Sequence, residues 1–258
     1  MSTQTNEIGS ASAAVALAAV ALGLAGLGAL SLGSGDFAFQ WQPVPPDIPA
    51  RDVLARAAGG LEILAAAMLL PARLRAAGAW LAAALLLGCT AMHVPSVVQR
   101  PASVADWLGI AEAGAMASAA LMLAASASRP ALRRAMAVVF GLCAVVFGVS
   151  HFVYADFTAS MIPAWLPQRI ALAWFTGGAH ALAGVAIATG LQRTLAAALE
   201  AAMMASFVLL VHLPRVLAHP DSRMEWTMLA VAVLLSGSAA MVAVVSRGAS
   251  AERLRTRP

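Results

Sequence analysis

Seven of the ionisable side chains that stand inside or at the ends of long apolar stretches are candidates for a common site. An ionisable group in hydrocarbon is costly unless it is paired, so each one is a candidate for function. Together they form a predicted polar pocket: Glu62, His93, Asp106, His151, His180, His212 and Glu225. Glu62 and His180 each stand about ten residues into an apolar stretch, which places both near mid-membrane. The sequence assigns no catalytic role to any of them.

Two of the histidines, His93 and His212, stand two residues before a proline that we expect to end each helix. Asp106 and Glu225 open the following apolar stretches, where a helix dipole favours a carboxylate. A histidine and an acid at one membrane face can form a hydrogen-bonded pair that fixes the imidazole tautomer. Such pairs would either tie helices together or form a binding or proton-handling site.

A metal site is a weaker interpretation of the same side chains. His151, His180 and His212 with Glu225 match the ligand preferences of zinc, copper or iron, but no H-x-x-x-H spacing fixes their geometry. We therefore predict no metal. No cofactor is identified either, because the chain has no haem attachment motif, iron–sulfur cysteine run or dinucleotide glycine fingerprint.

Other polar and aromatic residues receive separate interpretations. Glu112 has no counterpart in the second half, and we expect it to hydrogen-bond a neighbouring helix. Glu200 is expected near the cytoplasmic face, within reach of water. The proline-rich loops 35–49 and 156–167 each carry a tryptophan, Trp41 in the first, and these either belong to the interfacial aromatic belt or cover the pocket mouths as partial lids.

The elements that must position these residues are apolar helices. Hydrophobic residues make up 61% of the 258 residues and charged ones 11%, against roughly 25% charged in soluble domains. The apolar residues fall in blocks of about 20, enough to cross a bilayer core. The sequence predicts an all-α, polytopic membrane helix bundle with eight transmembrane helices, near 13–33, 53–71, 76–94, 105–126, 135–154, 170–190, 194–213 and 226–246.

Charge and cysteine usage bound the partners and the location. All 16 basic residues are arginines at the ends of apolar segments, so nucleic acid is an unexpected partner and the lipid bilayer an expected one. Ten arginines lie on the side of the two termini and five on the opposite side, which predicts an inner (cytoplasmic) membrane protein with both termini cytoplasmic. Cys89 and Cys143 stand in apolar segments without paired spacing and are expected to be inert.

The chain also repeats itself. Four residues recur at an offset of 119 positions, and others, such as Arg75 and Arg193, recur at 118. The four pairs are His93 and His212, Pro95 and Pro214, Asp106 and Glu225, and Trp107 and Trp226. We therefore expect two four-helix units, 1–127 and 128–258, in the same membrane orientation and related by a pseudo-two-fold axis along the membrane normal.

The second unit resembles a known family. The segments HFVYADFTASMIPAWLP, TGGAHALAGVAIA and VHLPRVLAHPDSRMEW are similar to those of DoxX-like four-helix membrane proteins. The first unit matches more loosely, with Ser31 in place of His151 and Glu62 in place of His180. The resemblance implies a small membrane subunit, associated in some members with thiosulfate:quinone oxidoreductase or with membrane redox complexes.

Three functions are consistent with these features. The first is a redox-associated, quinone-linked membrane component that binds a small apolar ligand between helices, with a quinone or a redox protein as partner. The second is a carrier for a small molecule or ion. The third is a non-catalytic membrane subunit or assembly factor in which the polar residues only hold helices together.

Overall fold

The computed structural model describes residues 11–125 and 129–255, and all regular secondary structure in these ranges is helical. The long helices are α2 (Ala11–Ser34), α3 (Arg51–Leu69), α4 (Arg75–Gln99), α5 (Val104–Ala124), α6 (Pro130–Val153), α8 (Arg169–Thr189), α9 (Arg193–Phe207) and α11 (Arg223–Arg255). Four short elements complete the described part: the 3-10 turn η1 (Phe39–Trp41), α7 (Ala155–Met161), the π turn η2 (Val208–His212) and α10 (Leu213–Ala218). The expected boundary between the two units, at residues 127 and 128, lies outside the described residues.

Seven helical segments of the described residues are long and apolar enough to cross a membrane, where the sequence predicted eight. The predicted second span exists as the 19-residue helix α3. It falls short of the other seven because Arg51, Asp52, Arg56 and Glu62 all lie on it. The chain thus has the character of a multi-pass helical membrane protein.

Two helix ends were predicted wrongly. Pro95 does not end its helix, because α4 continues through it to Gln99. Pro214 does not end its segment either, since it occupies the first turn of α10, which directly follows η2. Proline has no backbone N–H, and Pro214 needs none because it stands in the first turn of α10. His93 and His212 consequently lie inside continuous helical segments and not at their ends.

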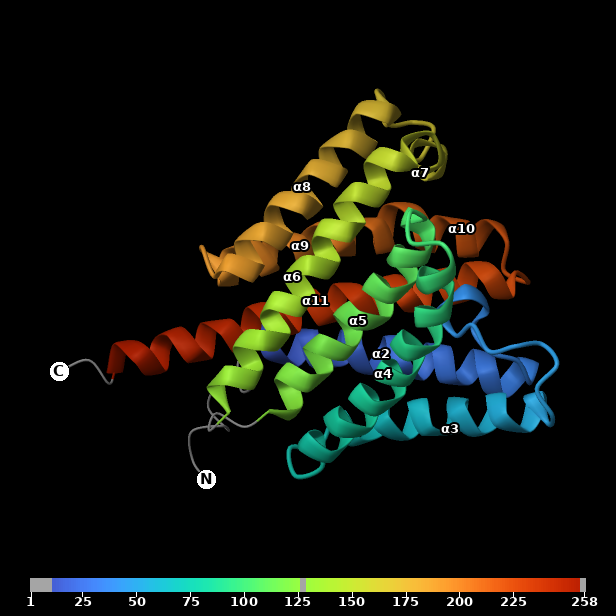
Figure 1. Ribbon diagram of the computed structural model, residues 1–258, viewed down its shortest axis with the longest axis horizontal. Helices are drawn as coiled ribbons and strands as arrows, with labels where there is room; N and C mark the ends of the chain where they lie inside the picture. The colour runs from blue at the N-terminus through green and yellow to red at the C-terminus, as the bar shows by residue number, and fades with distance from the viewer. Residues whose placement is uncertain (1–10, 126–128, 256–258) are drawn as a thin grey trace.

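The helices α5 and α11 run through the middle of the molecule (Figure 1). In chain order each long helix packs against the next, and α11 returns to pack against α2. Helices α5 and α11 also contact each other. Within the described residues, the first long helix therefore has the last one as a principal neighbour.

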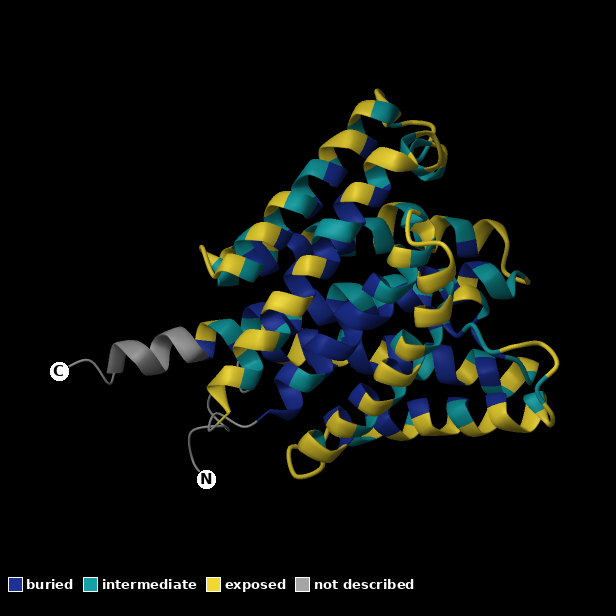
Figure 2. Ribbon diagram, viewed as in Figure 1, coloured by how far each residue is buried: buried dark blue, intermediate teal, exposed yellow. Residues whose placement is uncertain are grey.

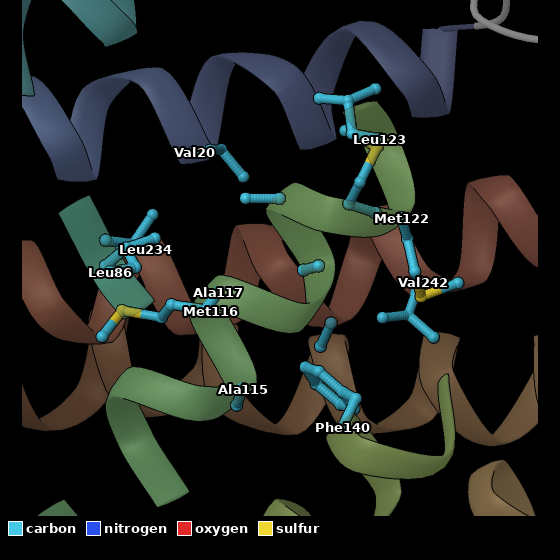
Figure 3. Packing of buried hydrophobic residues seen from close by; sticks show 14 of the residues in the cluster. Val20, Leu86, Ala115, Met116, Ala117, Met122, Leu123, Phe140, Leu234 and Val242 are labelled. Carbon is cyan, nitrogen blue, oxygen red and sulfur yellow. The ribbon is translucent and has the colours of Figure 1, made fainter. Parts of the chain in front are cut away.

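Small and apolar side chains fill the interior. Figure 2 shows buried positions concentrated along α5, α11 and the facing sides of α2 and α6. In Figure 3, Met116 and Met122 of α5 lie among Val20, Leu234 and Val242 from α2 and α11. Large apolar side chains point outward instead, among them Leu182 at 75% exposure and Leu217 at 73%. An outer surface of this kind is matched by lipid tails, not by water.

The segments after α2 and α6 differ in structure. Gly35 has φ +65°, a left-handed conformation open to glycine, and the chain there leaves α2 and turns back into η1. Ala155 at the corresponding place instead begins helix α7, where the sequence analysis expected a loop. The helices that follow each segment begin alike, after Ala50 (φ 53°) and Gln168 (φ 56°).

Candidate functional site

Two glycine pairs bring α2 against α3 and α6 against α8. A Cβ added to Gly28 would lie 2.5 Å from the carbonyl oxygen of Gly59, and one added to Gly148 would lie 2.6 Å from that of Gly177. Such distances are far inside van der Waals contact, so only glycine allows the helix backbones to approach this closely. One turn beyond each pair, the close approach holds Glu62 or His180 in the interior.

His180 of α8 is paired with an acid from the next helix. Its Nδ1 lies 2.6 Å from Oε1 of Glu200 on α9, and both side chains are almost fully buried. The prediction that Glu200 reaches water is therefore wrong. The two residues stand at similar distances on either side of the turn between α8 and α9, and residues so placed face each other in an antiparallel helix pair. That spacing was the signal in the sequence that could have revealed the contact.

His151 of α6 contacts a threonine of α8, Thr176. Its Nδ1 lies 2.9 Å from the Thr176 hydroxyl, which itself donates to the carbonyl oxygens of Leu172 and Ala173. Which of the two side chains donates in this contact depends on the tautomer of the imidazole. The rings of His151 and His180 lie 5.0 Å apart between centroids, and Phe207 packs against both.

Trp41 turns inward from η1 instead of lying in an interfacial belt. Its indole Nε1–H donates to Oε2 of Glu112 on α5 at 2.7 Å. Glu112 thus hydrogen-bonds a neighbouring segment as expected, although that segment is a loop element and not a helix. His93 of α4 is buried beside Gly109, and its Nε2 has no partner among the described residues.

These groups meet in one cavity of about 730 Å³ between the two halves of the chain. It extends from η1 and α7 inward to His180, and most of its wall is apolar, with Met204, Phe207 and Leu235 among the lining residues. Five of the seven predicted pocket residues line it: His93, Asp106, His151, His180 and His212. Trp41 also lines the cavity, in agreement with the partial-lid alternative, whereas Glu112 and Thr176 were not predicted as pocket residues.

Comparison with known proteins identifies no relative of this chain. Neither a protein-family model, nor a curated protein, nor a solved structure matches the chain. The site must therefore be interpreted from its own chemistry.

Glu62 of α3 lies outside that cavity. It is buried, and its Oε1 accepts a hydrogen bond of 2.6 Å from the Gln42 side-chain amide, while its Oε2 has no described partner. The other end of the amide, Oε1 of Gln42, accepts from the backbone N–H of Ala38 at 2.8 Å. The segment after α2 therefore covers Glu62 with a polar side chain of its own.

The two helix-opening acids pair with arginines, where we had expected histidines. Asp106 accepts from Arg100 at 2.7 Å, and Glu225 accepts two hydrogen bonds from Arg215, at 2.9 and 2.6 Å. Within the described residues neither acid accepts a hydrogen bond from a histidine. A guanidinium is always charged and carries several donors, so it is the stronger partner for a carboxylate.

His212 closes the π turn η2, and its Nδ1 is buried without a described partner. The two halves align at an offset of 118 at Arg75 and Arg193 but of 119 at His93 and His212, so the second half has one extra residue between these points. A π turn takes up one extra residue without ending the helix. His93 and His212 both line the cavity.

No group of three or more His, Cys, Asp or Glu side chains in the described part of the chain could hold a metal ion. Both cysteines are free.

A charged cluster lies outside the membrane-spanning segments, at the end of α2. Asp36 bonds Arg51 at 2.8 Å and Arg223 at 3.5 Å, and its Oδ1 accepts from the Phe37 amide at 2.8 Å. Burial raises the pKa of Asp36, but the Phe37 hydrogen bond and the two guanidinium groups outweigh it, so that the pKa lies below its ordinary value of 3.8. Arg223 also donates to the carbonyl oxygens of Asp36 and Phe37.

Proposed function

We propose that this chain is an inner-membrane protein of eight spans that binds a small, largely apolar molecule in the cavity between its halves. Helix α3, the second long helix in chain order, brings the number of spans from seven to eight. It packs between α2 and α4 and has 19 residues, about the length needed to cross the hydrocarbon core. Its charges gather near its start, apart from the buried Glu62.

Cysteine labelling tests the span count and the orientation. In a variant with Cys89 and Cys143 replaced by serine, single cysteines would be placed at Asp47 and Arg73, which flank α3. An impermeant maleimide added to intact cells should label position 47 and not position 73 until the membrane is opened. Labelling of both positions from the same side would remove α3 from the set of spans.

Two four-helix units support this architecture. The glycine contact between α2 and α3 recurs between α6 and α8, and Arg75 and Arg193 each donate to a carbonyl oxygen six residues earlier. Trp107 and Trp226 donate to the carbonyl oxygens of Pro101 and Pro220 at 2.9 Å in both cases. Contacts repeated at offsets of 118 to 120 are those expected of duplicated units in parallel orientation.

One observation carries the ligand-binding proposal. A mostly apolar cavity of about 730 Å³ contains a few convergent polar groups, namely the Trp41–Glu112 pair on one wall and the His151 and His180 rings on another. Ligand sites commonly have this composition and a volume of roughly 300 to 1,000 Å³. A buried polar group is costly in a purely structural role unless its hydrogen bonds are met, and His93 and His212 each keep an unmet one.

A quinone is one molecule of the required kind, and it is the ligand that the resemblance to DoxX-like proteins implies. Its carbonyl oxygens would accept from donors such as the Tyr154 hydroxyl, and its ring would lie among the aromatic side chains of the wall. A partner redox protein would supply or remove the electrons, since the described cavity wall contains no cysteine or metal group.

Ligand-induced stabilisation tests the binding proposal. A short-chain benzoquinone at 100 times its Kd should raise the free energy of unfolding of the purified protein by about 2.7 kcal/mol. Ala232→Phe, which fills the cavity from α11, should abolish the effect, whereas Val185→Phe on the lipid-facing side of α8 should not. Unfolding unaffected by quinone or other apolar ligands, with lipid extracts of the sample free of any bound small molecule, would contradict the proposal.

Transport is a second candidate, favoured by the π turn. The seventh span, Arg193–Ala218, changes its winding at Val208–His212 and places His212 at the cavity. Many transporters bind their substrate where a spanning helix departs from regular winding. Uptake of a bound ligand into proteoliposomes, lost in the Ala232→Phe variant, would support this function over static binding.

A further inference from the structure

The charges on the cavity wall are of one sign. Two carboxylates line it, Asp106 and Glu112, and none of the described lining residues is an arginine or lysine. Asp106 has Arg100 as a counter-ion at 2.7 Å, outside the lining. Glu112 has only the neutral indole of Trp41 as a described donor.

A carboxyl group in this position calls for a positive partner. In a medium of low dielectric constant an unpaired carboxylate is strongly unfavourable, so the group either keeps its proton or is accompanied by a cation. The protein supplies no such cation to Glu112 among its described residues. A ligand that brings a positive charge would complete this wall.

The remaining polar groups also favour a donor. Nδ1 of His151 is engaged by Thr176 and Nδ1 of His180 by Glu200, so only the Nε2 atoms of these rings remain for a ligand. Nε2 of His93 is buried without a described partner, on a side chain that lines the cavity and is 7% exposed. Neutral imidazole nitrogens of this kind accept N–H groups and do not repel positive charge.

Aromatic rings complete the enclosure. Trp41, Phe147, Tyr154, Phe157 and Phe207 all line the cavity. The faces of aromatic rings attract ammonium groups, and attract them more strongly when the groups are desolvated. An anionic ligand would meet Glu112, and a neutral one would leave the carboxyl without a counter-charge.

We infer that the cavity takes an organic cation, a protonated or quaternary amine on an apolar body, with its positive charge beside Glu112 and its body among the aromatic rings. This inference rests on the proposed ligand-binding function and names the ligand class. The amine would be held by charge and by ring faces, and its N–H groups, where present, would reach the imidazole acceptors.

A matched pair of probes tests the charge preference. (3-Phenylpropyl)trimethylammonium and the hydrocarbon in which carbon replaces its nitrogen have the same shape and differ in charge. Equilibrium dialysis against protein in an uncharged detergent should show the cation binding at least about tenfold more tightly than the isostere, after correction for micelle partition. The anion 4-phenylbutyrate should bind more weakly than either.

Variants locate the effect. Glu112→Gln should lower the affinity for the cation about tenfold and leave that of the isostere unchanged, because the amide still accepts from Trp41 but carries no charge. Glu62→Gln is the matched control, since it removes a buried carboxyl outside the cavity and should leave both affinities unchanged. Asp47→Asn, in an exposed loop, controls for net charge.

Each result has a defined meaning. Equal affinity for cation and isostere, or cation binding indifferent to Glu112→Gln, would overturn the inference. If the short-chain benzoquinone binds in the cavity while the cation does not, the ligand-binding function stands and the charge preference fails. If neither probe nor quinone binds, both fail. The wild-type comparison of cation and isostere needs no variant, so it holds even if Glu112→Gln does not fold.

Discussion

Glu62 and His180 occupy corresponding points of the two halves, 118 positions apart, yet their surroundings differ. Glu62 is covered by Gln42, which reaches it from the segment after α2. His180 is supported from behind by Glu200 of α9, and it faces the cavity. The position of Glu62 in the first half is therefore closed by Gln42, whereas the position of His180 in the second half is accessible to a ligand.

The cause of the difference lies in the segments that follow α2 and α6. Gly35 lets the segment after α2 turn back toward the bundle, so Trp41 and Gln42 both reach inward. Ala155 continues as α7, which lines the cavity mouth without filling it. A helix pair with the same glycine contact can therefore serve as a closed structural support or as part of a binding site, depending on the segment after its first helix.

The largest expected effect tests what the two halves share. Gly148→Ala and Gly28→Ala should each lower the free energy of unfolding by about 3 kcal/mol, because the added Cβ meets a backbone carbonyl of the facing helix. SDS titration in mixed micelles measures the change. Gly178→Ala and Gly60→Ala are matched controls with open space around the added Cβ, and they should be neutral or slightly stabilising. A large cost in one half only would break the equivalence of the helix pairs.

The second prediction concerns His180, the accessible position, and its partner Glu200. Glu200→Ala should lower the free energy of unfolding by about 2 kcal/mol, since it leaves the buried Nδ1–H of His180 unpaired. Leu199→Ala, on the exposed side of the same helix, is the control. In a double-mutant cycle with His180→Phe the two losses should not add. Additive losses would mean that the contact between the two side chains contributes little.

Substitution of Glu62, the closed position, should lower the free energy of unfolding by less than substitution of Glu200 does. Glu62→Leu should cost about 1 kcal/mol, because it leaves the Gln42 amide without its acceptor but also removes the unpartnered Oε2. The double variant with Gln42→Leu should recover part of the loss. Ligand binding in the cavity should stay unchanged in both variants, and a change in affinity would contradict the separation of the two positions.

The smallest effect concerns Asp36. Because its pKa is lower in the folded than in the unfolded chain, the unfolded state binds more protons in acid. The stabilising contribution is fully present above the ordinary value of 3.8 and is lost as the pH falls through the folded pKa. The carboxylate is partly exposed, so the contribution should stay below about 1 kcal/mol. Asp36→Asn should remove this part of the pH dependence of unfolding, measured between pH 6 and pH 3 at roughly constant ionic strength.

Helix positions could be predicted from the sequence, whereas several side-chain partners could not. Apolar length placed the helices, and His93 and His212, which the sequence pattern had paired, both line one cavity. Glu200 was predicted to reach water because it stands close to the start of its helix. Its distance from the turn between α8 and α9, which is similar to that of His180, would have indicated the contact between the two side chains instead. The arginine partners of Asp106 and Glu225 were missed, although Arg100 and Arg215 stand closer to these acids along the chain than His93 and His212 do.

The inward turn of Trp41 depends on contacts that no local pattern carries. It requires the positive φ of Gly35, the acceptor on α5 and the space left by α7. The π turn, by contrast, was present in the sequence as a one-residue change of offset between Arg193 and His212. A shift in the alignment of internal repeats can thus mark a change of helix winding.

Arg223 has a consequence for biosynthesis. This first residue of α11 donates to the backbone of Asp36 and Phe37 and lies over the ring of Phe39, 4.3 Å from its centroid. A nascent chain lacks this anchor until α11 has left the ribosome and entered the bilayer beside α2. The segment that carries Trp41 and Gln42 is synthesised long before α11, but it is fixed only after α11 has packed.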